Sequence, residues 1–378
     1  MPVNEPDWRA VRGEFPSLAR WTYLNTATFG QMPRRSMDAV ARHHERRNEL
    51  ACSDFLTWFD DADALRASLG RLINAEPSSI AFVGNACSAL SMLLNGIDWR
   101  RGDRIVTLEN EFPNNIYSPL MFATAGVEFV ETSWERIAEA VTPATRVVVL
   151  SEVNYTNGFR PPLAELSRLA HDAGALLFVD GTQSAGALKI DVQAFEADAY
   201  FAHGYKWLLS PPGSGFMYVR PSVSERLRPS VVGWRSHKTW RNVDNLHHGA
   251  PEFAAEAEKY EGGVLPFPAL YAMKASVDMF LELTPGAVEK RVQGLAGLLR
   301  EELRKLGARL PYDESPHFDS PLVAACFPGR EPKTISAALK ERGVLTSARH
   351  EYLRIATHLY NDEEDIARLI AGLRSLGI

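Results

Sequence analysis

The chain has 378 residues, of which 46% are hydrophobic and 23% are charged, and its formal net charge is −6. This length and composition are typical of a globular protein with a large hydrophobic core and two domains. The acidic balance argues against a nucleic-acid-binding protein, because it provides no positive field for a phosphate backbone.

Cysteine usage also limits the class of protein. The three cysteines, Cys52, Cys87 and Cys326, are widely spaced. This spacing fits neither a disulfide framework nor a CxxC metal site. We therefore expect reduced thiols in a cytoplasmic protein.

The sequence predicts no secretory signal, membrane span or metal site. Its first residues are partly acidic and lack the apolar run of a secretory signal. No stretch reaches the eighteen or more consecutive apolar residues that a membrane-spanning helix needs. The adjacent pairs His43-His44 and His247-His248 point to different faces of a helix or strand, so neither pair has metal-ligand spacing.

In chain order, a helical region precedes an alternation of strands and helices. Residues 34–74 have helical periodicity with a break near Cys52. A short strand at 80–83 is followed by the small-residue turn 84–88 and a helix at 89–97. The first amides of a helix are unpaired and lie at the positive end of its dipole, so this turn is a candidate anion site. The alternative is a plain strand-to-helix turn that binds nothing.

The next segments continue the alternation. Strands are predicted at 104–108, 146–151 and 176–180, and an amphipathic helix at 162–173. The pattern predicts an α/β protein with a mainly parallel sheet. In such sheets ligands bind at the carboxyl ends of the strands. The turn after Val83, the loop carrying Phe112, and the residues Asn154 and Asp180 are expected at those ends.

Asp180 and Lys206 are the first candidate catalytic residues. Asp180 ends the apolar run 176–179, and Lys206 lies between Tyr205 and Trp207 in a segment that otherwise reads as interior. Each alone has an ordinary explanation, an Asp-Gly turn for the first and a surface lysine for the second. Together they match one chemistry, in which an amine forms a Schiff base and a carboxylate keeps a pyridine nitrogen protonated. Pyridoxal phosphate enzymes require both groups.

The residues around this pair resemble a known family. The pattern Asp180-x-x-Gln183, the segment His203-Gly204-Tyr205-Lys206-Trp207 and the loop 211–215 are similar to the class V aminotransferases. These are fold type I pyridoxal phosphate enzymes, and the group includes cysteine desulfurases, kynureninases and isopenicillin N epimerase-like proteins. The resemblance spans residues 23–373. It implies a pyridoxal 5'-phosphate cofactor, a small amino acid substrate, and a homodimer in which each site is built partly from the partner.

The resemblance also implies roles for individual cofactor-binding residues. Phe112 matches the residue that stacks on the pyridine ring, although a plain core residue is the alternative. Asn154 and Gln183 match positions that reach the phenolic oxygen, unless each amide satisfies a loop instead. His203 and Tyr205 stand where the family has phosphate ligands. The phosphate turn falls on Ala86, Cys87 and Ser88; because the family usually has hydroxyl residues at the first two, backbone amides and Ser88 are the expected donors.

Three segments are expected to meet the substrate. Residues 353–361 are similar to the family's carboxylate-binding segment, which makes Arg354 the expected carboxylate ligand and a structural salt bridge the alternative. Asn25, Ala27 and Thr28 lie in a segment that the family places near the substrate entrance, where a plain turn is the alternative. Arg235 either faces a substrate or lies in an exposed loop.

The C-terminal part predicts a compact α+β unit. Helices are expected at 268–283 and 286–306, followed by strand, helix, strand, strand and helix at 321–326, 333–342, 344–348, 353–356 and 362–376. Three parts follow: an N-terminal segment near the active site (1–34), a large cofactor-binding domain (35–265) and a small C-terminal domain (266–378). Residues 261–266 resemble the segment that reaches the partner's phosphate, with Val264 where the family often has threonine, so any contact there would come from the backbone.

The predicted function is that of a class V aminotransferase-like enzyme that acts at the α-carbon of an amino acid, with Lys206 as the base. A β/γ-lyase of the kynureninase or C–S lyase kind and an amino-acid epimerase are alternatives on the same scaffold. Cysteine desulfurases are disfavoured, because residues 346–352 lack their nucleophilic cysteine. A non-catalytic cofactor-binding regulator would need a DNA-binding domain for which there is no length. A dinucleotide-binding oxidoreductase would need GxGxxG, which the turn 84–88 lacks.

Overall fold

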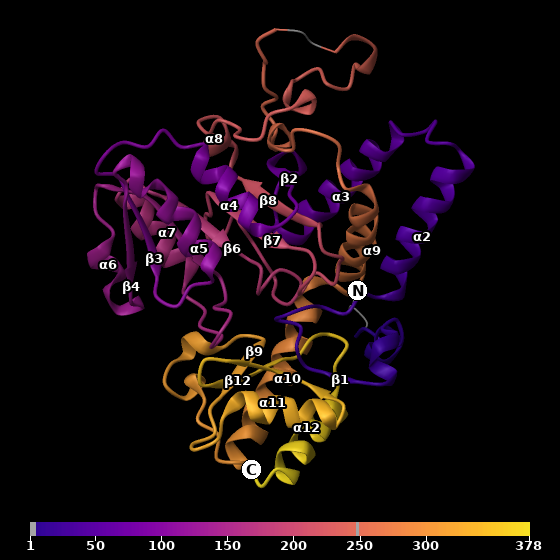
Figure 1. Cartoon of the computed structure of the whole chain (residues 1–378), viewed down its shortest axis with the longest axis vertical. Coiled ribbons are helices and arrows are strands. Elements are labelled where there is room, and N and C mark those ends of the chain that lie inside the picture. Colours follow the sequence, from indigo (N-terminus) through magenta and orange to yellow (C-terminus); the bar gives the residue numbers. More distant parts are fainter. Residues whose placement is uncertain (1–4, 247–248) are drawn as a thin grey trace.

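The computed structural model describes residues 5–246 and 249–378 (Figure 1). The His247-His248 pair and the first four residues of the expected N-terminal segment therefore lie outside the described residues. Within those ranges no helix is both long enough and apolar enough to cross a membrane. The same residues contain no group of three or more His, Cys, Asp or Glu side chains arranged to hold a metal ion.

A seven-stranded sheet forms the larger part of the molecule (Figure 1). Only β8 runs antiparallel to its two neighbours, so the expected α/β architecture with a mainly parallel sheet is confirmed. In spatial order the strands are β2 (Ile80–Phe82), β8 (Gly215–Val219), β7 (Ala199–His203), β6 (Leu176–Asp180), β5 (Thr145–Ser151), β3 (Arg104–Leu108) and β4 (Glu128–Thr132).

Both faces of this sheet are covered by helices. Because successive side chains of a strand point to opposite faces, each strand contributes apolar residues to both cores. On β6, Leu177 and Val179 pack into one core with α3 (Thr57–Ile73), α7 (Leu163–Asp172) and α9 (Phe267–Leu283), whereas Phe178 faces the other core with α4 (Ala86–Asn95). Four shorter helices complete this part: α1 (Trp8–Gly13), α5 (Pro113–Leu120), α6 (Ile137–Ala140) and α8 (Pro221–Ser224). The prediction of a buried strand at the apolar run 176–179 is therefore confirmed, and both of its faces are covered.

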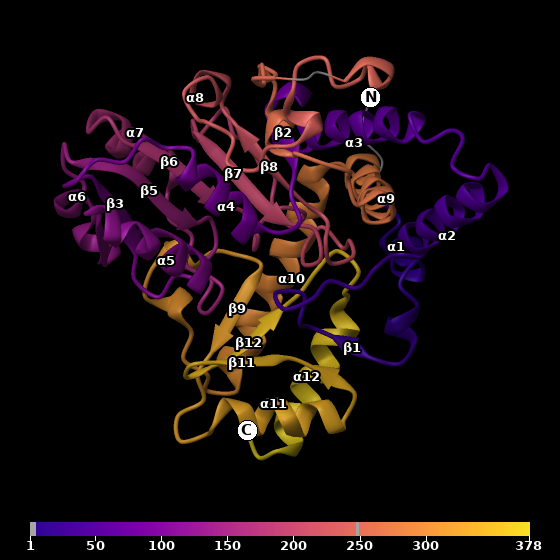
Figure 2. The same cartoon turned by 45° about the horizontal axis from the view of Figure 1, so that its top comes forward.

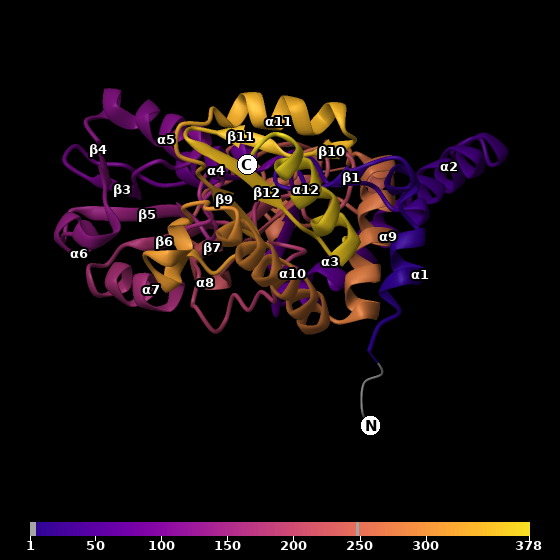
Figure 3. The same cartoon turned by 90° about the horizontal axis from the view of Figure 1, so that it is seen from below.

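The boundary expected at residue 266 moves to the start of α10 (Pro285–Lys305). The helix α9 packs against α2 (Arg34–Glu49) and α3, and its residues Met273 and Phe280 belong to the core of the large sheet. By contrast, Leu295 and Leu299 of α10 belong to a separate core. Figure 3 shows α9 beside α2, on the side of the molecule away from β4. The small unit therefore begins about twenty residues later than the apolar pattern of α9 suggested.

The small unit is built on a three-stranded antiparallel sheet in the order β11 (Ser347–Arg349), β12 (Tyr352–Ala356) and β9 (Leu322–Ala325). It lies below the large sheet in Figure 2, with α10, α11 (Pro332–Glu341) and α12 (Glu363–Ser375) packed on it. The strand expected at 344–348 is in fact two strands. Its first part, β10 (Val344–Leu345), pairs in parallel with β1 (Thr22–Tyr23) of the N-terminal segment.

Candidate active site

Candidate residues from distant parts of the chain lie along one edge of the large sheet. Asp180 is the last residue of β6, Lys206 follows the end of β7, and Asn154 follows β5. Phe112 follows β3 and caps the start of α5, while Ala86 begins α4 just after β2. These strands are mutually parallel, so their carboxyl ends meet where ligands bind in such sheets. The topology therefore brings together what the sequence spreads over 121 positions, from Ala86 to Lys206.

Lys206 is buried beneath aromatic side chains. Its side chain belongs to a residue that is only 7% exposed, and its Nζ lies 5.3 Å from the centroid of the Phe112 ring and 5.8 Å from that of Tyr205. The pKa of Lys206 is lowered to about 8, mainly by burial and also by the charges of Arg354 and Arg349, against the opposing effect of Asp180. A substantial fraction of the amine is therefore neutral near pH 8 and able to act as a nucleophile or base.

Asp180 is a buried carboxylate with one hydrogen-bonded oxygen. Its Oδ1 accepts a hydrogen bond of 2.9 Å from the Thr182 amide. Burial raises the pKa of Asp180, while the Thr182 hydrogen bonds and the charge of Lys206 oppose that rise. A cationic N–H group of a ligand beside this carboxylate would stabilise its ionised form.

The start of α4 and His203 form one hydrogen-bonded unit. Asn85 caps the helix, because its Oδ1 accepts from the Ser88 amide at 2.8 Å. The Ala86 amide donates to Nδ1 of His203 at 3.1 Å. That bond requires a lone pair on Nδ1, and burial together with the nearby Lys206 charge lowers the pKa of His203 to about 3, so its Nε2 carries the proton.

This arrangement corrects one expectation about the phosphate turn. The Ala86 amide already has an imidazole acceptor, and the Ser88 hydroxyl donates to the capping Asn85 at 3.1 Å. Cys87 is a half-buried free thiol. The remaining donors toward an anion at this end are thus the helix amide of Cys87 and the Nε2–H of His203.

Two amide side chains expected to touch the cofactor are held within the chain. Gln183 accepts from the indole N–H of Trp207 at 2.7 Å and donates to the carbonyl of Ala27 at 3.0 Å. Asn154 donates to the carbonyl of Asn110 at 2.9 Å and accepts from the amide two residues further on. One side-chain N–H of each amide is therefore bonded within the chain, as in the alternative in which the amide satisfies a loop. The second N–H of each is the one that a ligand could use.

Aromatic rings line the space around Lys206. Tyr205 packs against Phe29 on one side and His203 on the other, with ring centroids 4.8 Å apart in both pairs. Phe112 meets Tyr155 edge to face at 5.1 Å. Such walls exclude water and suit a flat ligand.

The N-terminal segment closes over Lys206. A side chain at Gly30 would place its Cβ 1.9 Å from the backbone oxygen of Lys206, so this close approach requires glycine. The Gly30 amide also donates to the carbonyl of Tyr205 at 2.9 Å. The N-terminal segment therefore lies against the backbone of Tyr205 and Lys206, which supports its expected position near the site.

Arg354 is buried, fully oriented and lacks an acidic partner. It is 2% exposed, and each of its three guanidinium nitrogens donates one hydrogen bond, from Nε to Ser347 Oγ at 3.0 Å, from Nη1 to the Tyr155 carbonyl at 2.7 Å and from Nη2 to Thr28 Oγ1 at 2.6 Å. Thr28 in turn donates to Asn25 Oδ1 at 2.8 Å. All acceptors are neutral, and no carboxylate of the described residues lies within 4.0 Å, so the structural salt bridge that was the alternative does not form.

Arg349 is a second cation that the sequence did not single out. It ends β11, and its charge is, after burial, a cause of the lowered pKa of Arg354, which falls to about 9. The register of the hairpin is what identifies it, because Arg349 and Ser347 are two residues apart and share a face, and Ser347 lies opposite Arg354.

The exposed-loop alternative for Arg235 is wrong, and its contact with a substrate stays a prediction. Arg235 is 1% exposed, so it does not lie in an exposed loop. Its guanidinium pairs with Glu261 at 2.8 Å and stacks over Trp240 at 4.4 Å and Phe59 at 4.9 Å. The Glu261 carboxylate and the two rings therefore give this buried guanidinium a structural setting within the chain, although its Nε has no hydrogen-bond partner among the described residues.

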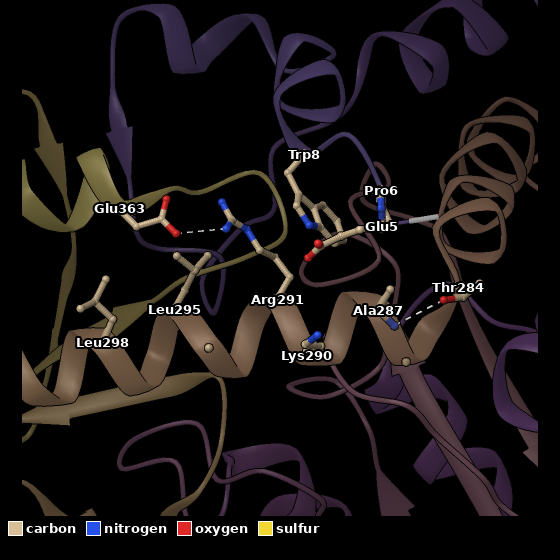
Figure 4. Close-up of a pocket in the computed structure, with 12 residues that line it drawn as sticks. Glu5, Pro6, Trp8, Thr284, Ala287, Lys290, Arg291, Leu295, Leu298 and Glu363 are labelled. Atoms are coloured by element: carbon tan, nitrogen blue, oxygen red, sulfur yellow. Dashed lines mark hydrogen bonds and ion pairs between the residues drawn. The ribbon is translucent and has the colours of Figure 1, made fainter. Parts of the chain in front are cut away.

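A groove of about 860 Å³ lies elsewhere, along α10 between α1 and the start of α12 (Figure 4). Its charged side chains pair across it, with Arg291 Nη1 3.3 Å from Glu363 Oε1. It contains none of the residues that gather at the sheet edge. The site around Lys206 is therefore the candidate active site.

Comparison with known proteins gives consistent matches. The sequence matches the family model described as Aminotransferase class-V over residues 22–369. It is 27% identical to the isopenicillin N epimerase of Streptomyces clavuligerus over 98% of each chain, and 29% identical to a probable cysteine desulfurase of Methanothermobacter thermautotrophicus over 71% of this chain and 68% of that one. A solved mutant of C-DES, with glycine covalently linked to its PLP cofactor, matches with a TM-score of 0.85 at 25% identity, covering 97% of this chain and 99% of that chain.

Proposed function

The chain belongs to the class-V aminotransferase family, and from that premise we propose that it removes the α-proton of an amino acid and transfers the amino group to a keto acid, which leaves the donor as a keto acid. Membership confirms the family predicted from the Asp180 and Lys206 motifs, together with the pyridoxal phosphate cofactor and the assignment as an enzyme. The observation that supports the reaction best is the pair formed by a buried amine of lowered pKa at Lys206 and a buried guanidinium without a carboxylate at Arg354.

The residues at the sheet edge fit pyridoxal phosphate. Asp180 offers a carboxylate that a protonated ring nitrogen would keep ionised, and Phe112 offers an aromatic face over Lys206 Nζ. The start of α4 and the neutral His203 offer N–H donors for a phosphate. When bound, this cofactor withdraws electrons from the α-carbon of an amino acid attached to it.

The chain's own side chains account for the remaining work. Lys206 in its neutral form accepts the α-proton at Nζ and returns it. Arg354 holds the substrate carboxylate through charge-assisted hydrogen bonds, and Thr28 and Ser347 keep its guanidinium in one orientation. Phe29, which packs on Tyr205 and is 49% exposed, stands at the entrance where it limits access of water.

Epimerisation is the second candidate, because the similarity to an isopenicillin N epimerase extends over 98% of both chains. Both reactions begin with the same proton transfer at Nζ of Lys206 and differ in the carbon that is reprotonated. A cysteine desulfurase reaction is less well supported, since residues 346–352 contain no cysteine. A C–S lyase remains on the same scaffold as the third branch.

The test measures α-proton removal directly. Purified protein with pyridoxal phosphate is incubated with each common amino acid in heavy water, and loss of the α-proton signal is followed by NMR. We expect exchange with at least one amino acid, with a keto acid product for transamination or the D-isomer for epimerisation. Lys206→Ala is expected to abolish exchange and the cofactor's absorption in the bound form.

Lys189→Ala is the matched control, since Lys189 is exposed and precedes β7, the strand that Lys206 follows. Its exchange rate should equal that of the natural chain. Absence of exchange with every amino acid, in protein that has bound the cofactor, would contradict the proposed function.

We further propose a homodimer that works in the cytoplasm. The support is a set of exposed apolar side chains, with Val264 and Met121 each 73% exposed, Tyr117 66% and Phe29 49%. In the segment 261–266, which is expected to reach the partner, the Glu261 side chain is buried and Val264 is exposed. Val264 is therefore free to contact a second copy. The three cysteines are free thiols, as expected in a reducing compartment. Light scattering after gel filtration tests the dimer, and a stable monomer that binds cofactor would contradict it.

A further inference from the structure

Two arginines project from the same face of the hairpin formed by β11 and β12. In this antiparallel pair Ser347 lies opposite Arg354, and Arg349 lies opposite Tyr352. Residues directly opposite one another point to the same face, and so do residues two apart on one strand. Arg349 and Arg354 are therefore neighbours on the face where Arg354 contacts Thr28 and the carbonyl of Tyr155.

Arg349 has no acidic partner either. It is half-buried, and the one side-chain hydrogen bond that it makes among the described residues runs from Nη1 to the carbonyl of Ala348 at 2.7 Å. No carboxylate in the described part of the chain lies within 4.0 Å of its guanidinium. Its charge is felt by both Lys206 and Arg354, whose pKa values it helps to lower. Because the register places Arg349 beside Arg354 and its side chain is half-buried, the remaining N–H donors of Arg349 lie on the face of the hairpin that carries the site.

Buried arginines elsewhere in the molecule are paired with acids. Arg66 meets Glu261 at 2.5 Å, and Arg300 meets Asp319 at 3.0 Å. Two neighbouring guanidinium groups without a carboxylate repel each other, and an arrangement of this kind is stabilised when anions bind. A single α-carboxylate satisfies only Arg354, which leaves Arg349 for a second anionic group.

We propose that Arg349 binds a second anionic group on the side chain of the substrate, so that the substrate is an acidic amino acid. The proposal rests on the proposed function and names its substrate class. Arg354 takes the α-carboxylate, the α-carbon lies over Lys206, and the side-chain acid reaches Arg349. A planar guanidinium with several N–H donors suits a carboxylate.

The test compares acidic amino acids with their neutral isosteres. The holoenzyme is titrated with L-glutamate, L-glutamine, L-aspartate and L-asparagine, and dissociation constants are read from the change in cofactor absorption. We expect one acidic member to bind about ten- to a hundredfold more tightly than its amide. Arg349→Gln should bring that ratio close to one, and Arg349→Lys should restore part of it.

Arg342→Gln is the matched control, because Arg342 is exposed and likewise donates to a backbone carbonyl, that of Ala338 at 2.8 Å. It should keep the full ratio. Equal binding of acid and amide by the natural chain overturns the proposal. A carboxylate of a second copy that pairs with Arg349 would give this result. A preference that survives Arg349→Gln overturns it as well.

The two proposals fail in distinguishable ways. Protein whose cofactor spectrum responds to no amino acid contradicts the proposed function and this proposal with it. Protein whose spectrum responds to acids and amides alike contradicts only the role of Arg349.

Discussion

Two arginine clusters of this molecule differ in one respect. In the first, Glu261 is buried between Arg66 and Arg235, at 2.5 Å and 2.8 Å. In the second, Arg354 is equally buried and makes three hydrogen bonds, but all of its acceptors are neutral, and within residues 5–246 and 249–378 Arg349 beside it has no acidic partner either. The first cluster is complete within the chain, whereas the second lacks a negative charge.

The difference separates structural from ligand-binding arginines. Burying a guanidinium costs several kcal/mol, which a carboxylate at hydrogen-bond distance offsets. Burial alone would raise the pKa of Glu261, but Arg66 and Arg235 hold it below its usual range. No such group offsets the burial of Arg354, whose pKa falls to about 9. The chain pre-positions that cation, and a substrate anion supplies the missing charge.

The largest expected effect comes from opening the complete cluster. Glu261→Gln leaves two buried guanidinium groups without their shared carboxylate, and the Glu261 carboxylate also accepts from the Phe82 amide at 2.8 Å. We expect a loss of about 3–5 kcal/mol in the free energy of unfolding, measured by denaturant titration. The control Glu128→Gln breaks an exposed pair with Arg104 and should cost less than about 1 kcal/mol. Equal losses in the two variants would contradict the distinction.

The next effect concerns the incomplete cluster. Arg354→Gln should lower kcat/KM by a factor of about thirty to several thousand. This factor corresponds to a loss of about 2–5 kcal/mol in transition-state binding. Its unfolding midpoint should not fall, because the substitution removes a buried charge that has no acidic partner. A variant that unfolds easily while its remaining folded fraction keeps full kcat/KM would mark Arg354 as structural.

The elements that the sequence predicts correctly are those with local signals. The apolar run ending in Asp180 became β6, and the break near Cys52 separates α2 from α3. The helix expected at 89–97 begins at Ala86, because Asn85 caps it through the Ser88 amide. That cap was visible as an asparagine three positions before a serine.

What the sequence did not predict depends on distant partners. Thr22 pairs with Val344 across most of the chain, and nothing near either residue signals it. The same holds for Arg235, whose position depends on Glu261 folding back under it. Arg349 was missed because its neighbourhood to Arg354 exists only in the register of the hairpin. The roles of the candidate site residues toward the cofactor stay predictions until variants test them.

A pH profile tests the electrostatics of the incomplete cluster. With its pKa lowered to about 8, Lys206 in cofactor-free protein should react with pyridoxal phosphate faster as pH rises through about 8, since the neutral amine is the nucleophile. A lysine whose folded pKa is below its unfolded value binds fewer protons in the folded state between these values. Relative to Lys206→Met, the natural chain should therefore gain stability from about pH 8 toward pH 10.5. A reaction midpoint near pH 10 would contradict the burial of an uncompensated amine.

The smallest effect links the two arginines to that amine. Both Arg354 and Arg349 lower the pKa of Lys206, so Arg354→Gln and Arg349→Gln should each move the midpoint of the reaction profile to higher pH. The shift for Arg354→Gln should be the larger, since Arg354 is the stronger of the two influences and lies deeper in the protein. Arg342→Gln, an exposed arginine of the same unit, should leave the midpoint in place. A midpoint unmoved by Arg349→Gln would show that the charge of Arg349 does not influence the pKa of Lys206. Arg349 would then lie outside the cluster, and Arg354 would be the one arginine of the pair that binds a substrate anion.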